Sequence, residues 1–447
     1  MQWPTVDAIV GNPPYHGSKK LRSRLGEQEV EWLKAEFEVG VKDYCVYFLR
    51  KAHEHLAVGQ RAGLVLTNSV SSGYNKDAGT RWVLENDGVF HNVLSNRDWS
   101  GEAEVVVSIL NWVKGAGYEG RRLLDGKEVG FIGPDLRESH SSQEPQKLTQ
   151  NSNIFFIGTN VGQHDGFIID EVTRLNLLAD SSVDYSQVLS PWLDGDELYE
   201  LPIIHPSRSI IDFHQMNLED AMAFPRALDI LRKKVRPIRE ETYPEGSKDR
   251  RYADRWWNYI RDGRQLRKAS EKLNYAMALV IHTQEFHVVK IDPSWRVNHG
   301  IGVFASDNDA LFGILLSSVH QTWARRRASS LGSSPRYSSN KVFKTFPLPA
   351  SDAPSLGKIA EIAREIDELR VGLMKRHNLG VRKLYQLAEQ GGFNNLLELH
   401  NDLNQLTLDA YGLNTGLKPH SSELFESVLK FNLAGGGSGS SGWNFRS

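Results

Sequence analysis

A short apolar run near the start of the chain ends abruptly in two consecutive prolines. The run, Val6–Val10, predicts a buried β-strand, and Gly11–Tyr15 follows it with prolines at positions 13 and 14. Neither proline has a backbone N–H to continue a ladder or a helix, and each holds the preceding residue in an extended conformation. The segment therefore predicts a stiff loop at a strand end, where open α/β sheets bind their ligands.

The composition is that of a globular protein. The 447 residues allow two or three domains, and 40% of them are hydrophobic and 24% charged. A formal net charge of −2 does not favour nucleic acid, so any DNA-binding surface must be local. The single cysteine, Cys45, excludes a disulfide framework and is predicted to lie in the core. Neither a membrane span nor a signal peptide is evident, so we expect a cytoplasmic protein.

The first 115 residues alternate between helical and strand patterns. A helix is expected over Lys42–Leu56, and strands are expected over Arg61–Asn68 and Glu104–Val113. This alternation predicts an α/β fold, as the latter half of a doubly wound sheet. Residues 116–150 are polar and rich in Gly, Ser and Gln, and we interpret them as a connector.

A second unit is expected over residues 151–350, followed by a helical segment over residues 351–432. In the helical segment, apolar residues recur at spacings of three and four from Leu356 to Leu373 and from Leu396 to Ala410. Each stretch predicts an amphipathic helix, and the two form a C-terminal helical pair. The glycine- and serine-rich end, residues 433–447, predicts a flexible tail.

Two segments of the second unit are locally basic. Leu231–Ser270 carries 13 Lys or Arg against 6 Asp or Glu, and Gln321–Phe346 carries six basic residues and no acidic one. Basic residues among aromatic, Ser and Asn side chains are typical of DNA contacts, although a solvated helix face remains an equal alternative for Leu231–Arg239. The loop-like, serine-rich Arg325–Lys344 favours DNA contact. The candidate DNA-binding residues are Arg255, Trp257, Arg325, Arg326, Arg327, Arg336, Tyr337 and Lys341.

Asn12–Tyr15 resembles the catalytic signature of enzymes that methylate a planar exocyclic nitrogen, and the element order after it is similar to that of adenine-N6 methyltransferases. Residues from Asp7 to about Tyr411, including Ser190–Leu198 and Arg208–Phe213, are similar to type IIG and IIL restriction–modification enzymes. In those enzymes the nuclease, methyltransferase and target-recognition domains share one polypeptide. The resemblance implies a partial Rossmann-like methyltransferase sheet, an α+β target-recognition domain and a pair of terminal helices.

The resemblance also implies roles for individual residues. The Asn12 side-chain oxygen and the backbone carbonyl held by the prolines, Pro13 and Pro14, would accept the two N–H groups of the target adenine, and Tyr15 would stack on the flipped-out ring. Trp99 is the candidate for the ring's other face, with a tryptophan that closes the core as the equal alternative. A mere rigid turn is the alternative for Asn-Pro-Pro itself.

The resembled enzymes bind S-adenosylmethionine at a glycine-rich loop that precedes the Asn-Pro-Pro-Tyr segment by many tens of residues. Only eleven residues precede Asn12, and no such loop follows in a suitable place. We therefore expect the C-terminal part of a larger prokaryotic enzyme, or one half of a split one, with most of the S-adenosylmethionine pocket outside this chain. Its expected partners are double-stranded DNA and, if the enzyme is split, a separate N-terminal methyltransferase or nuclease polypeptide.

Two other function classes remain open. One is a non-enzymatic DNA-specificity module in which the methyltransferase remnant is only a scaffold. The other is an Asn-Pro-Pro-Tyr enzyme acting on protein glutamine amides or RNA, which is less favoured because such enzymes do not typically carry a large C-terminal unit. The 15 histidines show no metal-ligand spacing, and neither a phosphate-loop nor a nuclease motif is present, so no metal site is expected.

Overall fold

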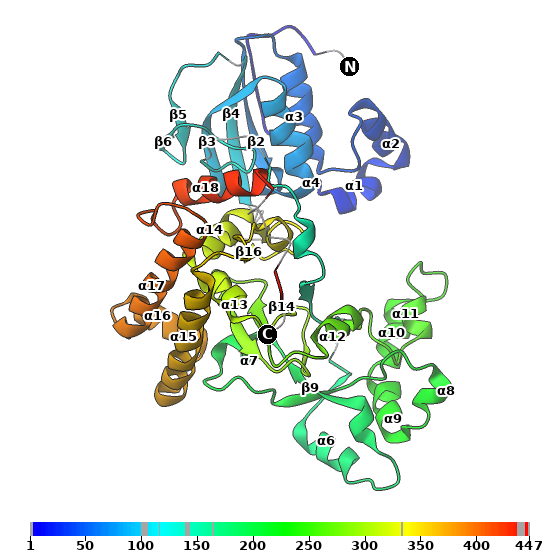
Figure 1. The fold of residues 1–447 in the computed structure, drawn as a ribbon. Coiled ribbons are helices and arrows are strands. Elements are labelled where there is room, and N and C mark those ends of the chain that lie inside the picture. The colour runs from blue at the N-terminus through cyan, green and yellow to red at the C-terminus, as the bar shows by residue number, and fades with distance from the viewer. Residues whose placement is uncertain are drawn as a thin grey trace. The chain divides into compact units, whose positions relative to one another are not determined.

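The computed structural model describes residues 3–99, 106–115, 117–138, 144–162, 165–331, 334–435 and 443–445. The chain divides into two compact units, Met1–Glu144 and Pro145–Ser447 (Figure 1). The finer boundaries expected at residues 115, 150, 350 and 432 stay predictions. Within the described ranges, no helix combines the length and the apolar character that crossing a bilayer requires.

A mixed six-stranded sheet, in the order β1-β2-β4-β3-β5-β6, forms the frame of the first unit. β1 is parallel to β2 and β3 is parallel to β5, whereas β4 runs antiparallel to both of its neighbours. The strands are β1 (Ala8–Gly11), β2 (Arg61–Thr67), β3 (Gly88–Asp98), β4 (Val106–Lys114), β5 (Arg122–Leu124) and β6 (Lys127–Val129). The three expected strands are present, and the segment interpreted as a connector contains the hairpin β5–β6.

Helix α3 (Tyr44–His55) packs on one face of this sheet, whereas α1 and α2 form a separate small core with α3. In β2 the alternate residues Ala62, Leu64 and Leu66 are buried beneath α3, and the residues between them are exposed or half-buried. Cys45 of α3 is fully buried in this core, as predicted. The helices are α1 (Ser18–Leu25), α2 (Glu27–Glu36), α3 (Tyr44–His55), α4 (Gly73–Lys76) and α5 (Trp82–Glu85), with a 3-10 turn at Asn68–Ser71 and a π-helical turn at Asp77–Arg81.

β1 is an edge strand, and the prediction of a buried strand is wrong. Among the described residues it pairs with β2 alone, and Val10 is 88% exposed. A strand is buried only when elements cover both its sides, which an apolar pattern cannot report. The sheet therefore presents a free, partly apolar edge beside the Asn12–Tyr15 loop.

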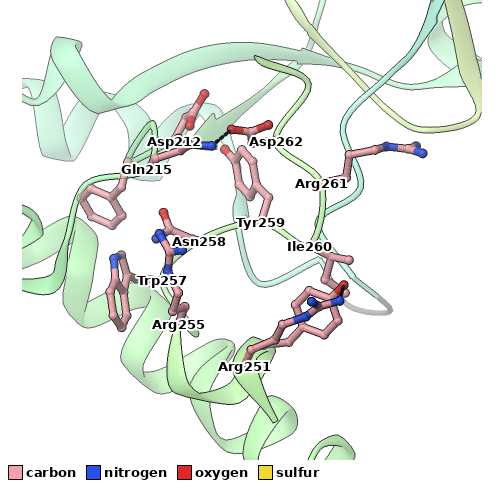
Figure 2. A pocket seen from close by; sticks show the side chains of 12 residues that line it. Asp212, Gln215, Arg251, Arg255, Trp257, Asn258, Tyr259, Ile260, Arg261 and Asp262 are labelled. Carbon is pink, nitrogen blue, oxygen red and sulfur yellow. Dashed lines mark hydrogen bonds between the residues drawn. The ribbon is translucent and has the colours of Figure 1, made fainter. Parts of the chain in front are cut away.

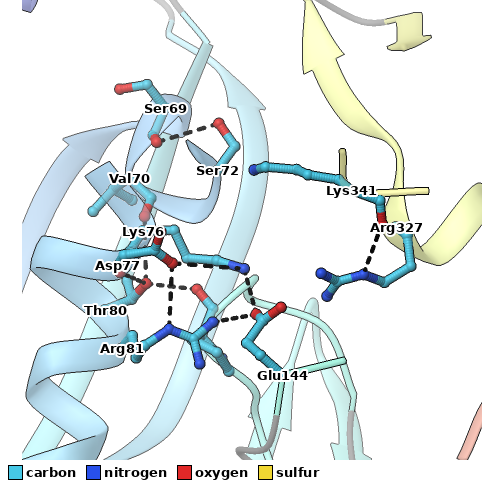
Figure 3. A network of polar contacts seen from close by, with 11 residues as sticks. Ser69, Val70, Ser72, Lys76, Asp77, Thr80, Arg81, Glu144, Arg327 and Lys341 are labelled. Carbon is cyan, nitrogen blue, oxygen red and sulfur yellow. Dashed lines mark hydrogen bonds and ion pairs between the residues drawn. The ribbon is translucent and has the colours of Figure 1, made fainter. Parts of the chain in front are cut away.

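A small ionic network closes the π-helical turn against the end of the unit (Figure 3). Glu144 accepts a hydrogen bond from Lys76 at 2.6 Å and is also paired with Arg81. Between these two cations, the buried Thr80 donates to the carbonyl of Pro134 at 2.5 Å. These contacts hold the segment that follows β2.

The second unit contains two four-stranded sheets, in the orders β13-β9-β10-β8 and β12-β11-β14-β7, and a short hairpin. Their strands are β7 (Phe155–Ile157), β8 (Ile168–Ile169), β9 (Leu189–Leu193), β10 (Arg208–Ile211), β11 (Ala276–Val280), β12 (Val289–Ile291), β13 (Arg296–Val297) and β14 (Ile301–Phe304). The hairpin is β15 (Ser329–Leu331) and β16 (Ser334–Arg336). Every residue of β11 and β14 is buried, which marks them as the central strands of the larger core.

Helices surround both sheets. Those before residue 350 are α6 (Glu171–Leu178), α7 (Gly195–Glu200), α8 (Leu218–Ala221), α9 (Pro225–Lys234), α10 (Arg236–Thr242), α11 (Arg251–Asp254), α12 (Arg264–Ser270), α13 (Asp309–Leu316) and α14 (Ser318–Arg327), with 3-10 turns at Thr149–Asn151, Tyr185–Val188 and Phe343–Thr345. In α9 the buried Ala227, Leu228 and Leu231 face the smaller core, and the basic residues Arg232–Lys234 are exposed, which fits the alternative of a solvated helix face.

The C-terminal region contains the two expected helices and two more. They are α15 (Leu356–His377), α16 (Val381–Glu389), α17 (Asn394–Ala410) and α18 (Ser422–Leu433). α13 crosses α15 closely at Gly313, where a Cβ would lie 2.6 Å from Ile359 Cγ2.

The predicted tail ends in an ordered contact. Residues 436–442 lie outside the described part of the chain, but the Trp443 indole donates to the carbonyl of Pro349 at 2.9 Å, and the carbonyl of Phe445 accepts from Ser306 at 2.6 Å. The prediction of a flexible tail is therefore wrong for residues 443–445, because two aromatic side chains bury themselves on the core.

Candidate active-site loop and nucleic-acid interface

The Asn12–Tyr15 loop leaves the carboxyl end of β1. The register pairs Gly11 with Leu64, so the loop begins beside the last residues of β2. Pro13 is buried and fixes the loop to the unit, whereas Asn12 is exposed and accessible to a ligand. This is the position that the sequence predicts for the loop.

A short hydrogen bond links the two polar side chains of the loop. The Tyr15 hydroxyl donates to Asn12 Oδ1 at 2.5 Å, and the carbonyl of Val65 in β2 lies 3.5 Å from the same hydroxyl. Partial burial, and to a smaller extent the nearby Cys45, raise the pKa of Tyr15 above its usual value, so the hydroxyl remains a donor at neutral pH. The Asn12 oxygen is thus an exposed acceptor held in one orientation.

A polar network under the loop connects it to β2 and α3. Asp43, just before α3, accepts from the backbone N–H of Ser18 at 2.7 Å and from the Ser69 hydroxyl at 2.6 Å. Ser69 in turn lies 2.8 Å from the hydroxyl of Thr67 at the end of β2. Local sequence patterns do not reveal Asp43 and Ser69, because the contacts between Asp43 and Ser18 and between Asp43 and Ser69 span 25 and 26 residues.

Trp99 lies at the same end of the sheet, along the strand direction, as the loop. It follows β3, whose last residue, Asp98, pairs with Val106 of β4, and Val107 pairs with Thr67 at the end of β2. The side chain is 38% exposed, so the alternative of a tryptophan that closes the core is wrong. β2 and β4 lie between β1 and β3, which separates the two strand ends by about 14 Å.

The three consecutive arginines of the second unit lie on a helix and not on a loop. They occupy the last turn of α14, where Arg325 pairs with Glu285 and Arg326 donates to the Ser422 hydroxyl at 2.5 Å. Arg327 contacts the carbonyl of the half-buried Lys341 at 3.4 Å. Each of these arginines is thus engaged within the unit, which weakens the prediction that they contact DNA.

Two aromatic candidates are buried. Tyr337 is fully buried, and its hydroxyl lies 2.8 Å from Nε2 of the buried His320. Trp257 is 8% exposed and donates its indole N–H to the carbonyl of Met216 at 2.9 Å. Their burial does not fit direct DNA contact, because both side chains complete the hydrophobic cores of the unit. Arg255 and Arg336, their neighbours in the sequence, are exposed.

Backbone pairing gathers Arg336 with residues from three other segments. The chain after β7 exchanges hydrogen bonds between Asn160 and Arg261, at 2.9 and 3.1 Å. An antiparallel bridge places His282 next to Arg336. His299 lies in the turn between β13 and β14, whose backbone pairs with the same stretch after β7. We refer to Arg261, His282, His299 and Arg336 as the cation cluster.

The cation cluster has an excess of positive charge. Partial burial lowers the pKa of His282, and Arg336 and His299 lower it further. Burial likewise lowers the pKa of His299, and repulsion from Arg261 lowers it further. Burial also lowers the pKa of Arg261, and repulsion from Arg336 adds to this effect. Within the described part of the chain, no carboxylate forms an ion pair with a member of the cluster. Such a group attracts phosphates or the acceptor atoms of base edges.

Among the described residues, no group of three or more His, Cys, Asp or Glu side chains is arranged to hold a metal ion.

Two segments of the chain match known protein families. Residues 4–92 match the Eco57I restriction-modification methylase family, and residues 140–350 match the MmeI target recognition domain family. These matches identify a methylase segment of the restriction–modification type followed by a target-recognition domain, and they confirm the resemblance found in the sequence. None of the curated proteins matches the chain significantly.

Among solved structures, the chain is similar to the type IIL restriction-modification enzyme MmeI in complex with DNA. The TM-score is 0.73 at 18% sequence identity, covering 96% of this chain and 57% of that one. This chain therefore has the fold of somewhat more than half of that enzyme. The type IIG restriction endonuclease BpuSI matches with a TM-score of 0.27 at 14% identity, over 91% of this chain and 54% of that one. The DrdV–DNA complex matches with a TM-score of 0.40 at 10% identity, over 83% and 45%.

Proposed function

We propose that this chain contains the target-binding loop and the specificity unit of a DNA adenine-N6 methyltransferase of the restriction–modification type. The observation that carries the proposal is the Asn12–Tyr15 loop at the carboxyl end of β1, within the segment that matches the methylase family. The exposed Asn12 acceptor and the half-buried Tyr15 ring are the two groups that a flipped adenine requires.

Asn12 and Pro13 would act on the amino group of the adenine. Its nitrogen is a poor nucleophile, because the lone pair is delocalised into the ring. Acceptance of its two N–H groups by Asn12 Oδ1 and the carbonyl of Pro13 would direct that lone pair out of the ring plane. Tyr15 would exchange its hydrogen bond to Asn12 for a stacking contact with the ring. S-Adenosylmethionine, when bound, supplies the methyl group.

The DNA would bind to the second unit. The cation cluster offers two guanidinium groups and two imidazoles without a carboxylate partner among the described residues. Arg336 is the member that best suits a base edge, because an exposed guanidinium can bind guanine through two hydrogen bonds. The target-recognition family of residues 140–350 supports this assignment.

The free edge of β1 suggests where the methyl donor would be held. Val10 is 88% exposed on a strand with one described neighbour, so another strand could pair there and cover it. We propose that a donor-binding segment, from the same polypeptide or from a separate one, adds to the sheet at β1.

Calorimetric titration of S-adenosylmethionine tests this function, first with the chain alone and then with a co-expressed donor-binding segment. Binding only in the presence of the segment, followed by methyl transfer to unmethylated DNA, would support the proposal. Binding by the chain alone would overturn the assignment of the donor site. DNA binding without donor binding or methylation in either sample would favour a specificity module without enzymatic activity.

A further inference from the structure

The second unit contains an open cavity of about 490 Å³. Its walls come from residues 212–215, which follow β10, and from residues 251–262, which include α11 and the loop after it (Figure 2). Three arginines, Arg251, Arg255 and Arg261, line it. We refer to this feature as the arginine cavity.

The carboxylates of the arginine cavity are already neutralised. Asp212 is buried and pairs with Arg296 at 3.0 Å, and Arg267 lies 3.8 Å away. Asp262 pairs with Arg267 at 3.5 Å and accepts from Gln215 at 2.6 Å. Both carboxylates are therefore paired with cations other than the three lining arginines.

The lining arginines remain available to a ligand. Arg255 is exposed and has no ion pair or hydrogen bond from its side chain within the described residues. Arg251, whose side chain is 70% exposed, donates one hydrogen bond to the Tyr252 hydroxyl at 3.2 Å and lies over that ring, and its nearest carboxylate, that of Asp249, is 3.9 Å away. Arg261 uses one guanidinium nitrogen to donate to the carbonyl of Gly158 at 3.1 Å. The cavity thus presents an excess of positive charge to solvent.

A fourth arginine, Arg239, is buried beneath the cavity lining and binds its backbone. It is 1% exposed, and its guanidinium donates to the carbonyls of Asn258 at 2.6 Å, Tyr252 at 3.2 Å and Arg255 at 3.4 Å. A further bond reaches the carbonyl of Val161 at 2.9 Å. Burial lowers the pKa of Arg239 to about 10, so the group stays charged at neutral pH. One buried cation thereby fixes the loop that carries Arg255.

The other lining groups do not favour base recognition. Trp257 is buried and offers no open face for stacking, and the Tyr259 hydroxyl is bound to the carbonyl of Ile211 at 2.7 Å. The amide of Gln215 is engaged at both ends, by Asp262 and Arg264. Asn258 donates to the carbonyl of Met216 at 3.3 Å. What remains free is charge, and guanidinium groups spaced along an open cavity suit consecutive phosphates of a nucleic-acid strand.

We propose that the arginine cavity binds the phosphodiester backbone of duplex DNA independently of sequence, with Arg239 as its positioning residue. This inference rests on the proposed DNA-binding function and deepens it: Arg251 and Arg255 supply general affinity and hold the duplex in place. Reading of base edges is left to other residues, such as Arg336.

Fluorescence anisotropy with two labelled duplexes of unrelated sequence, over a series of salt concentrations, tests this inference. Each phosphate contact contributes about 0.9 to the slope of log K against log salt. The double variant Arg251→Gln/Arg255→Gln should therefore lower the slope by about 2, and weaken binding at low salt by roughly 10- to 100-fold for both duplexes alike. The control Arg376→Gln removes an exposed arginine of α15 and should change neither quantity.

Arg239→Lys tests the positioning role. Lysine keeps the positive charge but cannot serve four carbonyls, so this variant should lower the salt slope in the same direction as the double variant. Combining it with Arg251→Gln/Arg255→Gln should cause little further change. Additive losses would mean that Arg239 acts only on general stability, which a circular-dichroism melting curve of each variant measures in parallel.

The outcomes distinguish a failure of the proposed DNA-binding function from a failure of the arginine cavity alone. Failure of the wild-type chain to bind either duplex at low salt would overturn the DNA-binding function itself. Wild-type binding with an unchanged slope in the double variant would overturn the arginine cavity alone. A loss confined to one of the two duplexes would show base reading and would likewise overturn the phosphate assignment.

Discussion

The Tyr15 hydroxyl donates a hydrogen bond to Asn12 Oδ1, the oxygen that the proposed mechanism assigns to the adenine amino group. The loop is thus closed on itself through the acceptor that the proposed mechanism uses. In the proposed mechanism the adenine amino group replaces this bond, and the Tyr15 ring becomes free to reorient when it does. The polar network through Asp43 and Ser69 keeps the loop backbone in place during that exchange.

Asn12→Ala should abolish methyl transfer and leave DNA affinity nearly unchanged. The side chain is exposed and bonded only within its loop among the described contacts, so its loss removes an acceptor without disturbing the core. Methyl transfer from labelled S-adenosylmethionine to unmethylated DNA, with the donor-binding segment present, measures the first quantity, and anisotropy measures the second. Equal loss of both in a folded variant would contradict the role of Asn12.

Tyr15→Phe and Tyr15→Ala should differ. Phenylalanine keeps the stacking ring and frees Asn12, so methylation should stay within about threefold of wild type. Alanine removes the ring, and base stacking is worth about 1–3 kcal/mol, so activity should fall by roughly 10- to 100-fold. Single-turnover rates of the two variants provide the measurement. Similar losses in both would assign the importance of Tyr15 to its hydroxyl.

DNA binding should tighten as the pH falls from about 8 to 5.5. In the free protein, burial and neighbouring cations lower the pKa of His282 and His299. A bound phosphate favours the protonated imidazole and raises the pKa in the complex, so the complex takes up protons and affinity increases towards acid. We expect roughly a tenfold gain.

Anisotropy at several pH values measures this effect. His282→Gln/His299→Gln should flatten the dependence, and the control His377→Gln, on α15, should not. A wild-type affinity that is independent of pH would remove the two histidines from the interface.

Gly158→Ala should destabilise the second unit. A Cβ at this position would lie 2.3 Å from the carbonyl oxygen of Asn298, so the strand that organises the cation cluster would have to move. Overpacking of this kind costs about 1–3 kcal/mol in the free energy of unfolding. Denaturant unfolding measures it, with Gly357→Ala as the control, because nothing lies within 4 Å of a Cβ there. Equal stability of both variants would contradict the close approach.

Much of the local structure could be predicted from the sequence. The apolar pattern of Arg61–Asn68, the amphipathic run over Lys42–Leu56 and the stripe from Leu356 to Leu373 correspond to β2, α3 and α15. The prolines at positions 13 and 14 stop β1 where a loop is expected. These predictions succeed because they depend on backbone restraints and on the periodicity of a few adjacent side chains.

The tertiary structure decided which of the predicted residues are accessible. Trp257 and Tyr337 lie in basic segments yet are buried, and Arg325 of α14 pairs with Glu285, 40 residues away. Val10 is exposed, although the apolar run that contains it predicts a buried strand.

The cation cluster and the arginine cavity likewise exist only in three dimensions. Pairing after β7 joins Asn160 to Arg261, and Arg239 binds carbonyls that lie 13 to 19 residues further along the chain, together with that of Val161. The sequence by itself determined the elements, the stiff loop and the basic character of two segments. Burial, ion pairing and the gathering of like charges were decided by contacts between distant residues, and local patterns do not encode those contacts.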